Sequence, residues 1–488
     1  MSTIQPSTRL AWARWIPYCL MVSDILALLL AFYLARISHA LRSNMNPVAV
    51  LSHWWGDSVH ISLLLLAALV IFAVGLFTFK GHYNQRKAFW DEIGEIIWVL
   101  TVLTILNAAI AFSGNWAISR LWIFTNWILA LLLLPGLRAL CRKTLRWIGI
   151  WERPVAIIGC GENAHDVMQM IRQETTLGYT LQAILQPDAS CVADSLSALP
   201  VSTQVLGDDC FSTLSRLGNP HVILALEPEQ WALQEQLLRS MGNRYPNLSI
   251  SPPLRDLPLF GLETIHFFGH EVLMLRINDN LARIGPRIIK RAFDLIVATL
   301  LLLLLAPFML SIAWRIKRAD GGAALYAQER IGFRGRPFQC LKFRSMIVDA
   351  DKKLFEYLEL HPELKAEYEL SLKLKNDLRI TSIGNFLRKT SLDELPQLLN
   401  VIHGDMSLVG PRPVTEKELD EYYKESAQIY KRVHPGITGL WQISGRSETT
   451  YARRIDLDSW YIRNWSLWHD IVILLRTVKV VLQNKGAY

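Results

Sequence analysis

Four apolar stretches near the start of the sequence constrain what this chain can fold into, because each approaches the length of a membrane span. A helix needs about 20 predominantly apolar residues to cross a hydrocarbon core. We expect the last stretch to continue past Pro135, and we predict a membrane α-helical bundle of four spans over residues 1–148. The stretches are about Ile16–Ile37, Ile61–Phe79, Ile96–Phe112 and Leu121–Leu134.

Basic residues beside these stretches predict the orientation of the bundle. Loops rich in Lys and Arg stay in the cytoplasm, so the N-terminus and everything from about residue 140 onward are expected to lie there. Asp24, inside the first stretch, is either a functional intramembrane charge or a buried packing partner, and we favour the second interpretation. The basic residues are Arg9 and Arg14 before the first stretch, Lys80, Arg86 and Lys87 between the second and third, and Arg138, Arg142, Lys143 and Arg146 after the fourth.

The overall composition narrows the class of partner. The chain has 488 residues, of which 51% are hydrophobic and 19% charged, and its net charge is +8. A basic balance favours an anionic partner, and the apolar stretches make that partner lipid and phosphate rather than nucleic acid. The six cysteines show no paired spacing, so neither a disulfide framework nor a zinc site is predicted.

The middle of the chain has the pattern of a Rossmann-like α/β domain, predicted over residues 149–270. An apolar strand, Val155–Ile158, is followed by the turn Gly159–Gly161 and a helical pattern through Ile171. This order of strand, glycine turn and helix occurs in dinucleotide-binding folds. The acidic residue expected after the second strand is replaced by Gln186-Pro187. Cofactor binding and a structural or regulatory turn therefore both remain open, and we favour the structural turn.

A fifth apolar segment, Leu295–Ala313, is expected not to cross the membrane. Basic residues flank it on both sides, and Pro307 lies inside it. A proline removes a helix hydrogen bond and bends the chain. We predict a re-entrant helix over about residues 288–313 that breaks at Pro307 and returns to the leaflet it entered. A straight span kinked at Pro307 is the alternative.

The segment from Lys342 to Trp465 carries a set of charged and glycine-rich motifs. Together these motifs resemble those of the bacterial polyprenyl-phosphate hexose-1-phosphate transferases, and the resemblance covers nearly all of the chain. It implies that residues 271–488 form a mainly α catalytic domain, which includes the re-entrant helix. The motifs are Lys342–Met346, Arg388–Gln397, Gly404–Pro413, His434–Gln442 and Ser444–Arg446.

The resemblance also implies an activity, a location and partners. The expected enzyme transfers a hexose-1-phosphate from a UDP-sugar to undecaprenyl phosphate and releases UMP, as the first membrane step of O-antigen, capsule or exopolysaccharide synthesis. Galactose-1-phosphate is the favoured group and glucose-1-phosphate the alternative. The implied location is the bacterial inner membrane, multi-pass, with the catalytic domain on the cytoplasmic face. A homodimer is expected.

Two adjacent carboxylates, Asp393 and Glu394, are the predicted catalytic and metal-binding residues. Breaking a sugar diphosphate needs a nucleophile at phosphorus and a hard cation that masks negative charge. Asp393 can attack phosphorus while Glu394 helps to hold Mg²⁺, which takes one or two carboxylates plus substrate phosphates. The resemblance implies a phosphosugar intermediate on Asp393. The alternative is that Ser391 and Glu394 form a capping box at a helix start.

Basic side chains in the same segment are predicted to bind substrate phosphate, because arginine can bind phosphate through two nitrogens at once. Arg412 stands out, since Pro411 and Pro413 stiffen the backbone on both sides. Asp458 matches a further acidic active-site position of the family, or else it caps the following helix. The predicted phosphate-binding residues are Lys342, Arg344, Arg388, Arg412 and Arg446.

The C-terminal segment has an amphipathic pattern. Trp460, Trp465 and Trp468 precede Ile471–Leu482, which suggests a helix in the lipid headgroup layer. A helix packed in a protein core shows the same pattern, so both interpretations stand.

Two other classes of function are less consistent with the sequence. A nucleotide-sugar dehydratase or epimerase needs a Tyr-x-x-x-Lys pair after the glycine turn, and the one such pair, Tyr83–Lys87, precedes it. A non-catalytic membrane scaffold or chain-length regulator accounts for the spans. It leaves Asp393, Glu394 and the neighbouring arginines without a role.

Overall fold

The computed structural model divides the chain into two compact units, Met1–Pro253 and Leu254–Tyr488, and each unit is considered by itself. The described residues are 14–42, 57–113, 120–187, 202–206, 210–254, 257–259, 262–266, 273–277, 280–350, 354, 379–445 and 450–482.

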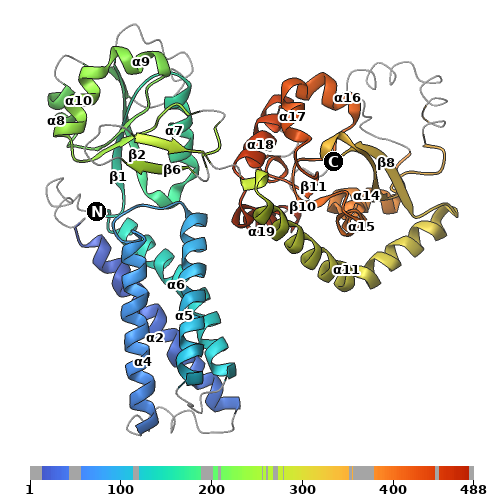
Figure 1. The fold of residues 1–488 in the computed structure, drawn as a ribbon, viewed down its shortest axis with the longest axis horizontal. Coiled ribbons are helices and arrows are strands. Elements are labelled where there is room, and N and C mark those ends of the chain that lie inside the picture. The colour runs from blue at the N-terminus through green and yellow to red at the C-terminus, as the bar shows by residue number, and fades with distance from the viewer. Residues whose placement is uncertain are drawn as a thin grey trace. The chain divides into compact units, whose positions relative to one another are not determined.

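The first unit begins with a bundle of four helices (Figure 1), as the apolar stretches predicted. α2, α5, α6 and also α11 of the second unit are long and apolar enough to cross a membrane, while α4 is shorter over its described apolar part, Leu63–Phe79. α6 continues through Pro135 as expected. The bundle helices are α2 (Ile16–Arg42), α4 (Asp57–Phe79), α5 (Phe89–Ser113) and α6 (Arg120–Trp147).

Small side chains let the bundle helices approach closely. Ala27, Ala31, Ala73 and Ala130 are completely buried, and small residues at helix contacts are typical of membrane bundles. Leucines and isoleucines face outward instead, for example Leu64 at 72% exposure. An apolar outer surface over a packed interior is what a lipid solvent requires.

A buried ionic network around Arg138 stabilises one end of the bundle. Its Nε and Nη2 donate to the two carboxylate oxygens of Asp24 (2.7 and 2.6 Å), and its Nη1 donates to Glu92 (2.7 Å). The Tyr83 hydroxyl donates to Asp24 as well (2.8 Å). The interpretation of Asp24 as a buried packing partner is confirmed. Lys87 pairs with Glu95, so both residues of the Tyr-x-x-x-Lys pair have structural partners here.

A five-stranded parallel sheet follows, with the order β3-β2-β1-β4-β5, which confirms the predicted α/β fold. Alternate residues of the central strand face opposite sides: Val155 and Ile157 pack beneath α7, while Ala156 and Ile158 pack with α8 and α10. The strands are β1 (Arg153–Ile158), β2 (Tyr179–Gln186), β3 (Ser202–Val205), β4 (His221–Leu224) and β5 (Leu248–Ile250), and the helices are α7 (Glu162–Gln173), α8 (Cys210–Arg216), α9 (Pro228–Leu233) and α10 (Glu235–Arg244).

Arg86 joins the bundle to the sheet. It leaves the loop between α4 and α5, donates to the carbonyls of Leu177 (2.5 Å) and Trp151 (2.7 Å), and lies 4.6 Å from the Trp151 ring centroid. Arg86 therefore has a structural role in addition to its place among the basic residues that predict orientation. Cys160 of the glycine turn is disulfide-bonded, which the cysteine spacing did not predict.

The second unit is mainly helical, and its described residues also form three two-stranded sheets, one of which pairs β6 with β7. A hairpin of β8 and β9 is antiparallel, and β10 pairs with β11 in parallel. The elements are β6 (Glu263–His266), β7 (Leu273–Arg276), α11 (Ile284–Asp320), β8 (Leu325–Ile331), β9 (Pro337–Phe343), α14 (Ser382–Thr390), α15 (Gln397–His403), β10 (Ser407–Val409), α16 (Glu416–Glu418), α17 (Ala427–Tyr430), β11 (Gly436–Thr438), α18 (Tyr451–Arg463) and α19 (Leu467–Leu482).

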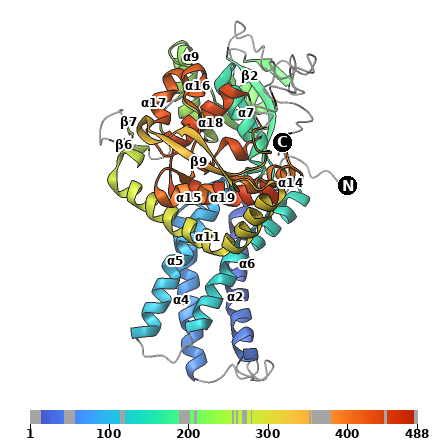
Figure 2. The same cartoon turned by 90° about the vertical axis from the view of Figure 1, so that its right-hand side faces the viewer.

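The long helix α11 is continuous over 37 residues with Pro307 inside, and it bends in its middle (Figure 1 and Figure 2). A proline cannot donate to the preceding turn, which is the usual cause of such a bend. The middle of the helix is apolar and outward-facing: Leu300, Leu303 and Leu304 are 61%, 69% and 75% exposed. Such a surface is unfavourable in water.

Candidate active site

The two predicted carboxylates lie on a tight turn between two helices. α14 ends at Ser391, whose φ of 56° is left-handed, and a single 3₁₀ turn then covers Leu392–Glu394. Ser391 makes no side-chain cap to this turn. The Glu394 carboxylate instead accepts a hydrogen bond from Lys342 Nζ (2.9 Å) on β9. The capping-box alternative is therefore wrong, because a capping box requires the Ser391 side chain to accept a hydrogen bond from the backbone of this turn.

Asp393 lies in an environment that opposes its negative charge. Burial raises the pKa of the Asp393 carboxyl above its usual range, and the neighbouring charge of Glu394 raises it further. Lys342 and Arg388 act in the opposite direction without cancelling the rise. A cation placed beside this buried carboxylate pair would favour the ionised forms.

The donor chemistry fits Mg²⁺. In the part of the chain that the structure describes, no group of three or more His, Cys, Asp and Glu side chains could hold a metal by itself. Mg²⁺ does not need such a cage, since one or two carboxylates, water and substrate phosphates commonly complete its oxygen shell. Asp393 and Glu394 supply that number of carboxylates, with the remaining positions left for substrate.

A polar pocket lies beside the turn and combines several of the predicted residues. Lys342, Glu394 and Arg412 line it, so segments more than 50 residues apart in sequence converge here. Arg330, Gln397 and Gln442 also line the pocket, and the sequence analysis had missed them as site residues. Gln397 and Gln442 belong to the quoted motifs and could have been included, whereas Arg330 stands alone in the hairpin strand β8 without a motif.

Of the other predicted phosphate-binding residues, two have side-chain partners and one lies outside the described residues. Arg344 pairs with Asp320 at the end of α11. Arg388 Nε donates to the Ser345 hydroxyl (2.8 Å), although its charge still acts on Asp393. Arg446 lies outside the described residues.

A close backbone approach and a side-chain hydrogen bond position the loop that carries Arg412. A Cβ on Gly436 would lie 2.1 Å from the nitrogen of Gly410, so β10 and β11 can pair in this way only with glycine there. The Tyr430 hydroxyl also contacts the carbonyl oxygen of Arg412 at 3.3 Å. The guanidinium itself is exposed and lies 5.9 Å from the Trp441 ring centroid. The backbone is fixed while the charged group stays accessible to an anionic substrate.

Asp458 is buried inside the catalytic unit. It lies in the middle of α18, whose N-cap is Thr450. The alternative interpretation of Asp458 as a helix N-cap is therefore wrong. Its carboxyl accepts a hydrogen bond from the Tyr423 hydroxyl (2.9 Å). Burial raises the pKa of Asp458 to about 8, against the opposing effects of Tyr423 and Arg412. A role in the active site remains a prediction.

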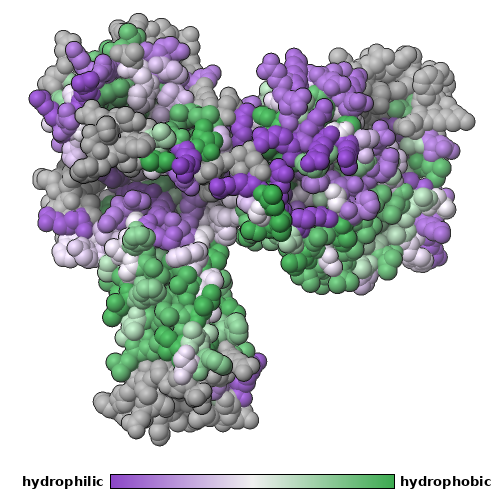
Figure 3. Space-filling model, in the orientation of Figure 1, coloured by the Kyte–Doolittle hydropathy of each residue, from purple (hydrophilic) through white to green (hydrophobic). Residues whose placement is uncertain are grey.

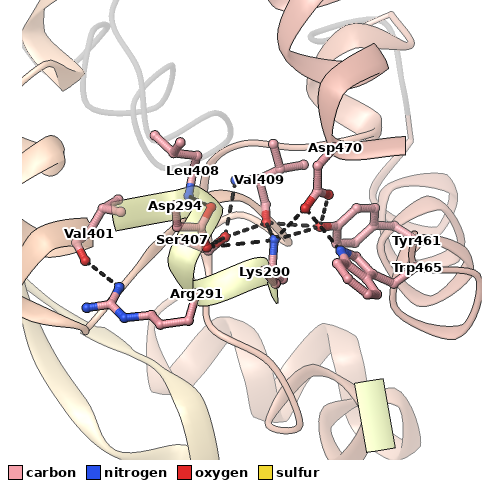
Figure 4. Close-up of polar contacts among 10 residues, drawn as sticks. All are labelled: Lys290, Arg291, Asp294, Val401, Ser407, Leu408, Val409, Tyr461, Trp465 and Asp470. Carbon is pink, nitrogen blue, oxygen red and sulfur yellow. Dashed lines mark hydrogen bonds and ion pairs between the residues drawn. The ribbon is translucent and has the colours of Figure 1, made fainter. Parts of the chain in front are cut away.

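A second buried network fastens α11 to the catalytic core (Figure 4). Lys290 Nζ of α11 donates to Asp470 (2.8 Å) and to the carbonyl of Val409 (3.0 Å). Asp470 also accepts from the Tyr461 hydroxyl (2.6 Å) and from the Trp465 indole (3.0 Å). Val409 is the last residue of β10, directly before the loop of Arg412. Lys290 is one of the basic residues before the apolar segment Leu295–Ala313, and the structure gives it a buried partner.

Comparison with known proteins decides the family. The model of bacterial sugar transferases matches residues 285–484. The undecaprenyl-phosphate galactose phosphotransferase of Salmonella typhimurium is 40% identical over 86% of this chain and 87% of its own length. The chain is a bacterial sugar transferase. The resemblance to polyprenyl-phosphate hexose-1-phosphate transferases is thereby confirmed, and the chain is an enzyme rather than a scaffold.

Two further relatives of this transferase differ in the sugar that their names give. The UDP-galactose-lipid carrier transferase of Erwinia amylovora is 41% identical over 86% of this chain and 87% of its own length. The UDP-glucose:undecaprenyl-phosphate glucose-1-phosphate transferase of Escherichia coli is 30% identical over 87% of this chain and 89% of its own length.

A model described as a CoA-binding domain matches residues 78–205, which include the bundle helices α5 and α6 and the sheet as far as β3. At the N-terminus of α7, where a dinucleotide fold holds phosphate, the chain places its own carboxylate. Glu227 Oε1 accepts from the backbone N–H of Asn163 (2.7 Å), and a Cβ on Gly161 would lie 2.8 Å from the same oxygen. This geometry favours the structural interpretation of the glycine turn.

Burial raises the pKa of Asp458 in the folded chain. The free energy of unfolding is therefore expected to depend on pH. The folded chain holds the Asp458 proton more tightly than the unfolded chain, whose pKa is near the ordinary value of 3.8. The stabilisation is complete below about pH 4 and is lost as the pH rises through about 8. We expect the thermal unfolding midpoint of the wild type to fall relative to that of Asp458→Asn over this interval. Asp420→Asn, an exposed carboxylate, is the control, and a constant difference between wild type and Asp458→Asn would contradict the assignment.

Proposed function

We propose that this transferase moves galactose-1-phosphate from UDP-galactose to undecaprenyl phosphate and releases UMP. The observation that carries the proposal is the pocket in which Glu394, next to Asp393, meets Lys342 and Arg412. Galactose is preferred to glucose because the relatives named for galactose are 40% and 41% identical, against 30% for the glucose enzyme.

The first chemical step is attack by an Asp393 oxygen on the phosphorus that bears the sugar. The bond from that phosphorus to the UMP oxygen breaks, and UMP leaves with the electron pair. Asp393 must be ionised to attack, and Lys342 beside it favours the ionised form. Arg412, exposed at the pocket, can bind the charge that develops on the departing nucleotide. Mg²⁺ held by Asp393 and Glu394 would supply charge neutralisation for the diphosphate.

In the second step, an oxygen of undecaprenyl phosphate attacks the same phosphorus. The bond to Asp393 breaks, the carboxylate is restored, and the lipid carries the sugar diphosphate. Splitting the transfer into two displacements lets the nucleotide leave before the lipid phosphate arrives. The two anionic substrates therefore need not occupy the pocket together, which reduces their mutual repulsion.

The lipid substrate cannot leave the bilayer, so the catalytic unit has to bind the membrane surface. We propose that α11 enters and leaves the same leaflet as a re-entrant helix that bends at Pro307. Three features support this: its bent shape, its exposed apolar middle (Figure 3) and exposed basic side chains on both flanks, such as Arg287 and Arg318. The face of α19 with Leu475, Val478 and Leu482 is also exposed and apolar, which supports a position in the headgroup layer.

We place the transferase in a bacterial inner membrane with the catalytic unit on the cytoplasmic face, and we propose that it works as a homodimer in O-antigen, capsule or exopolysaccharide synthesis. The cytoplasmic location follows from the basic loops and from the nucleotide-sugar substrate, which is made inside the cell.

Release of UMP tests the proposed reaction. Purified transferase with Mg²⁺ and undecaprenyl phosphate is expected to release UMP from UDP-galactose faster than from UDP-glucose. Asp393→Asn removes the attacking oxygen's charge and should lower the rate by about 10³-fold or more. Asp420→Asn, an exposed carboxylate of the same unit, should keep the wild-type rate. Full turnover by Asp393→Asn would overturn the mechanism, and a preference for UDP-glucose would overturn the sugar.

The side on which the catalytic unit lies can be tested by cysteine labelling. In a cysteine-free background, Glu416→Cys places a thiol at an exposed site of the catalytic unit, and Ser113→Cys places one at the end of α5. With a membrane-impermeant maleimide applied to intact cells, we expect Ser113→Cys to react from outside. Glu416→Cys should react only after the membrane is opened. Labelling of Glu416→Cys in intact cells would show that α11 crosses as a straight span.

A further inference from the structure

Arg454, near the start of α18, contacts two aromatic rings of the catalytic unit. Its Cζ lies 4.7 Å from the ring centroid of Trp441 and 5.8 Å from that of Tyr451. A planar guanidinium stacks well on aromatic faces. These contacts hold a partly exposed side chain in place, but they leave its positive charge without a negative partner.

No acidic side chain neutralises Arg454 in the part of the chain that the structure describes. It forms no ion pair with a described residue, and its Nε has no hydrogen-bond partner there. Arg330 of the same unit is paired instead, with Glu418 (2.9 Å). Taking a cation out of water without a negative partner is costly. A partly buried guanidinium in this state therefore predicts an anionic ligand.

Arg454 lies beside Arg412 of the active-site pocket. The Trp441 ring that Arg454 contacts is also 5.9 Å from the Cζ of Arg412. Arg412 in turn lines the pocket that contains Glu394. Two guanidinium groups therefore meet at one indole, at the edge of the site from which the nucleotide is proposed to leave.

A second set of contacts leads from Arg454 to the same pocket. The Tyr451 hydroxyl lies 3.5 Å from Oε1 of Glu418, and the other carboxylate oxygen of Glu418 accepts from Arg330 Nη1 (2.9 Å). Arg330 also lines the pocket. Both aromatic neighbours of Arg454 thus connect it to residues of the active site.

The direction of α18 separates Arg454 from the helix that we propose to enter the lipid. Near the other end of α18, the Tyr461 hydroxyl accepts from Lys290 Nζ of α11 (3.3 Å). Arg454 comes seven residues earlier, about 10 Å away along the helix. It lies toward α16, which is on the side of the catalytic unit away from α11 (Figure 1 and Figure 2). A soluble nucleotide reaches this side more readily than a phosphate held at the membrane surface.

The charge of the nucleotide changes in a way that fits a second arginine. The phosphate next to uridine carries one negative charge in a UDP-sugar. In free UMP it carries close to two, because the second pKa of a phosphate monoester is about 6. Arg412 supplies one positive charge, and Arg454 supplies another.

We propose that Arg454, together with Arg412, binds the phosphate of the UMP half of the UDP-sugar and of the UMP that leaves. This inference rests on the proposed function, since it assigns a second residue to the nucleotide of that reaction. The phosphate of undecaprenyl phosphate has similar chemistry, so the test has to separate the two sources.

Binding of UMP to the purified full-length transferase in the presence of Mg²⁺ tests the inference without turnover. Isothermal titration calorimetry measures the affinity. Arg454→Gln is expected to weaken UMP binding about tenfold, which is typical of the loss of one charged hydrogen-bonding partner. Arg453→Gln removes the same charge from the neighbouring, exposed position of α18 and should keep the wild-type affinity.

Steady-state kinetics separate the nucleotide from the lipid. Because the proposed reaction has two displacements, the kcat/KM for each substrate reports its own step. Arg454→Gln should lower the kcat/KM for UDP-galactose about tenfold and leave that for undecaprenyl phosphate unchanged. If this variant does not fold, Arg454→Lys keeps the charge, loses the planar fork and should weaken UMP binding severalfold.

Several results would overturn the inference. They are no binding of UMP by the wild type, wild-type affinity in a folded Arg454 variant, an equal loss in Arg453→Gln, and a loss of kcat/KM that is as large for undecaprenyl phosphate as for UDP-galactose. If UMP binding depends on Arg454 but the wild type releases no UMP from UDP-galactose or UDP-glucose, the proposed reaction is contradicted and the nucleotide site stands.

Discussion

In the proposed mechanism, two adjacent carboxylates, Asp393 and Glu394, approach a diphosphate that is itself negatively charged. Like charges repel strongly in a partly buried site. Burial raises the pKa of Asp393, and the neighbouring charge of Glu394 raises it further. Lys342, in contact with Glu394, reduces the repulsion, and Arg412 adds positive charge at the pocket. In the proposed mechanism, Mg²⁺ held by Asp393 and Glu394 would neutralise the remaining charge.

The same electrostatic requirement links the site to the membrane helix. Lys290 of α11 reaches Asp470 and the carbonyl of Val409, so the helix that we propose to enter the leaflet is tied to the strand leading to Arg412. Arg291 of α11 binds the carbonyls of Val401 and Ile402 at the end of α15, the helix that follows the two carboxylates. Under this proposal, the depth of α11 in the lipid would set the height at which Arg412 and the two carboxylates lie relative to a lipid phosphate. Removing one partner of a buried ion pair is strongly destabilising. The contact between Lys290 and Asp470 is therefore expected to persist in the folded protein.

Several parts of the fold could be predicted from sequence because they depend on local pattern. The membrane helices follow from apolar length, and the parallel sheet follows from apolar strands that alternate with helical patterns. Two local ambiguities were not resolvable. Whether Asp458 caps a helix depends on where that helix begins, and it begins at Thr450. Whether Ser391 caps the turn that contains Glu394 depends on the backbone conformation of Ser391, which is left-handed. A serine at that position does not predict this conformation.

The parts that could not be predicted depend on contacts between distant residues. Lys290 and Asp470 are 180 positions apart, and each alone resembles an ordinary surface charge. Arg330 enters the pocket because β8 pairs with β9, and its partner Glu418 comes from yet another segment. Glu227, which caps the N-terminus of α7, follows the fourth strand of the sheet. In each case the residue type was visible and its partner was not.

The mass of the intact enzyme after reaction with a single substrate tests the central claim most directly. The transferase is mixed with UDP-galactose and Mg²⁺ in the absence of undecaprenyl phosphate, quenched and weighed by mass spectrometry. The account predicts a gain of one hexose phosphate, located by peptide mapping at Asp393 and lost when undecaprenyl phosphate is added. An enzyme that turns over fully with both substrates but never carries the adduct, or that carries it on another residue, would contradict it.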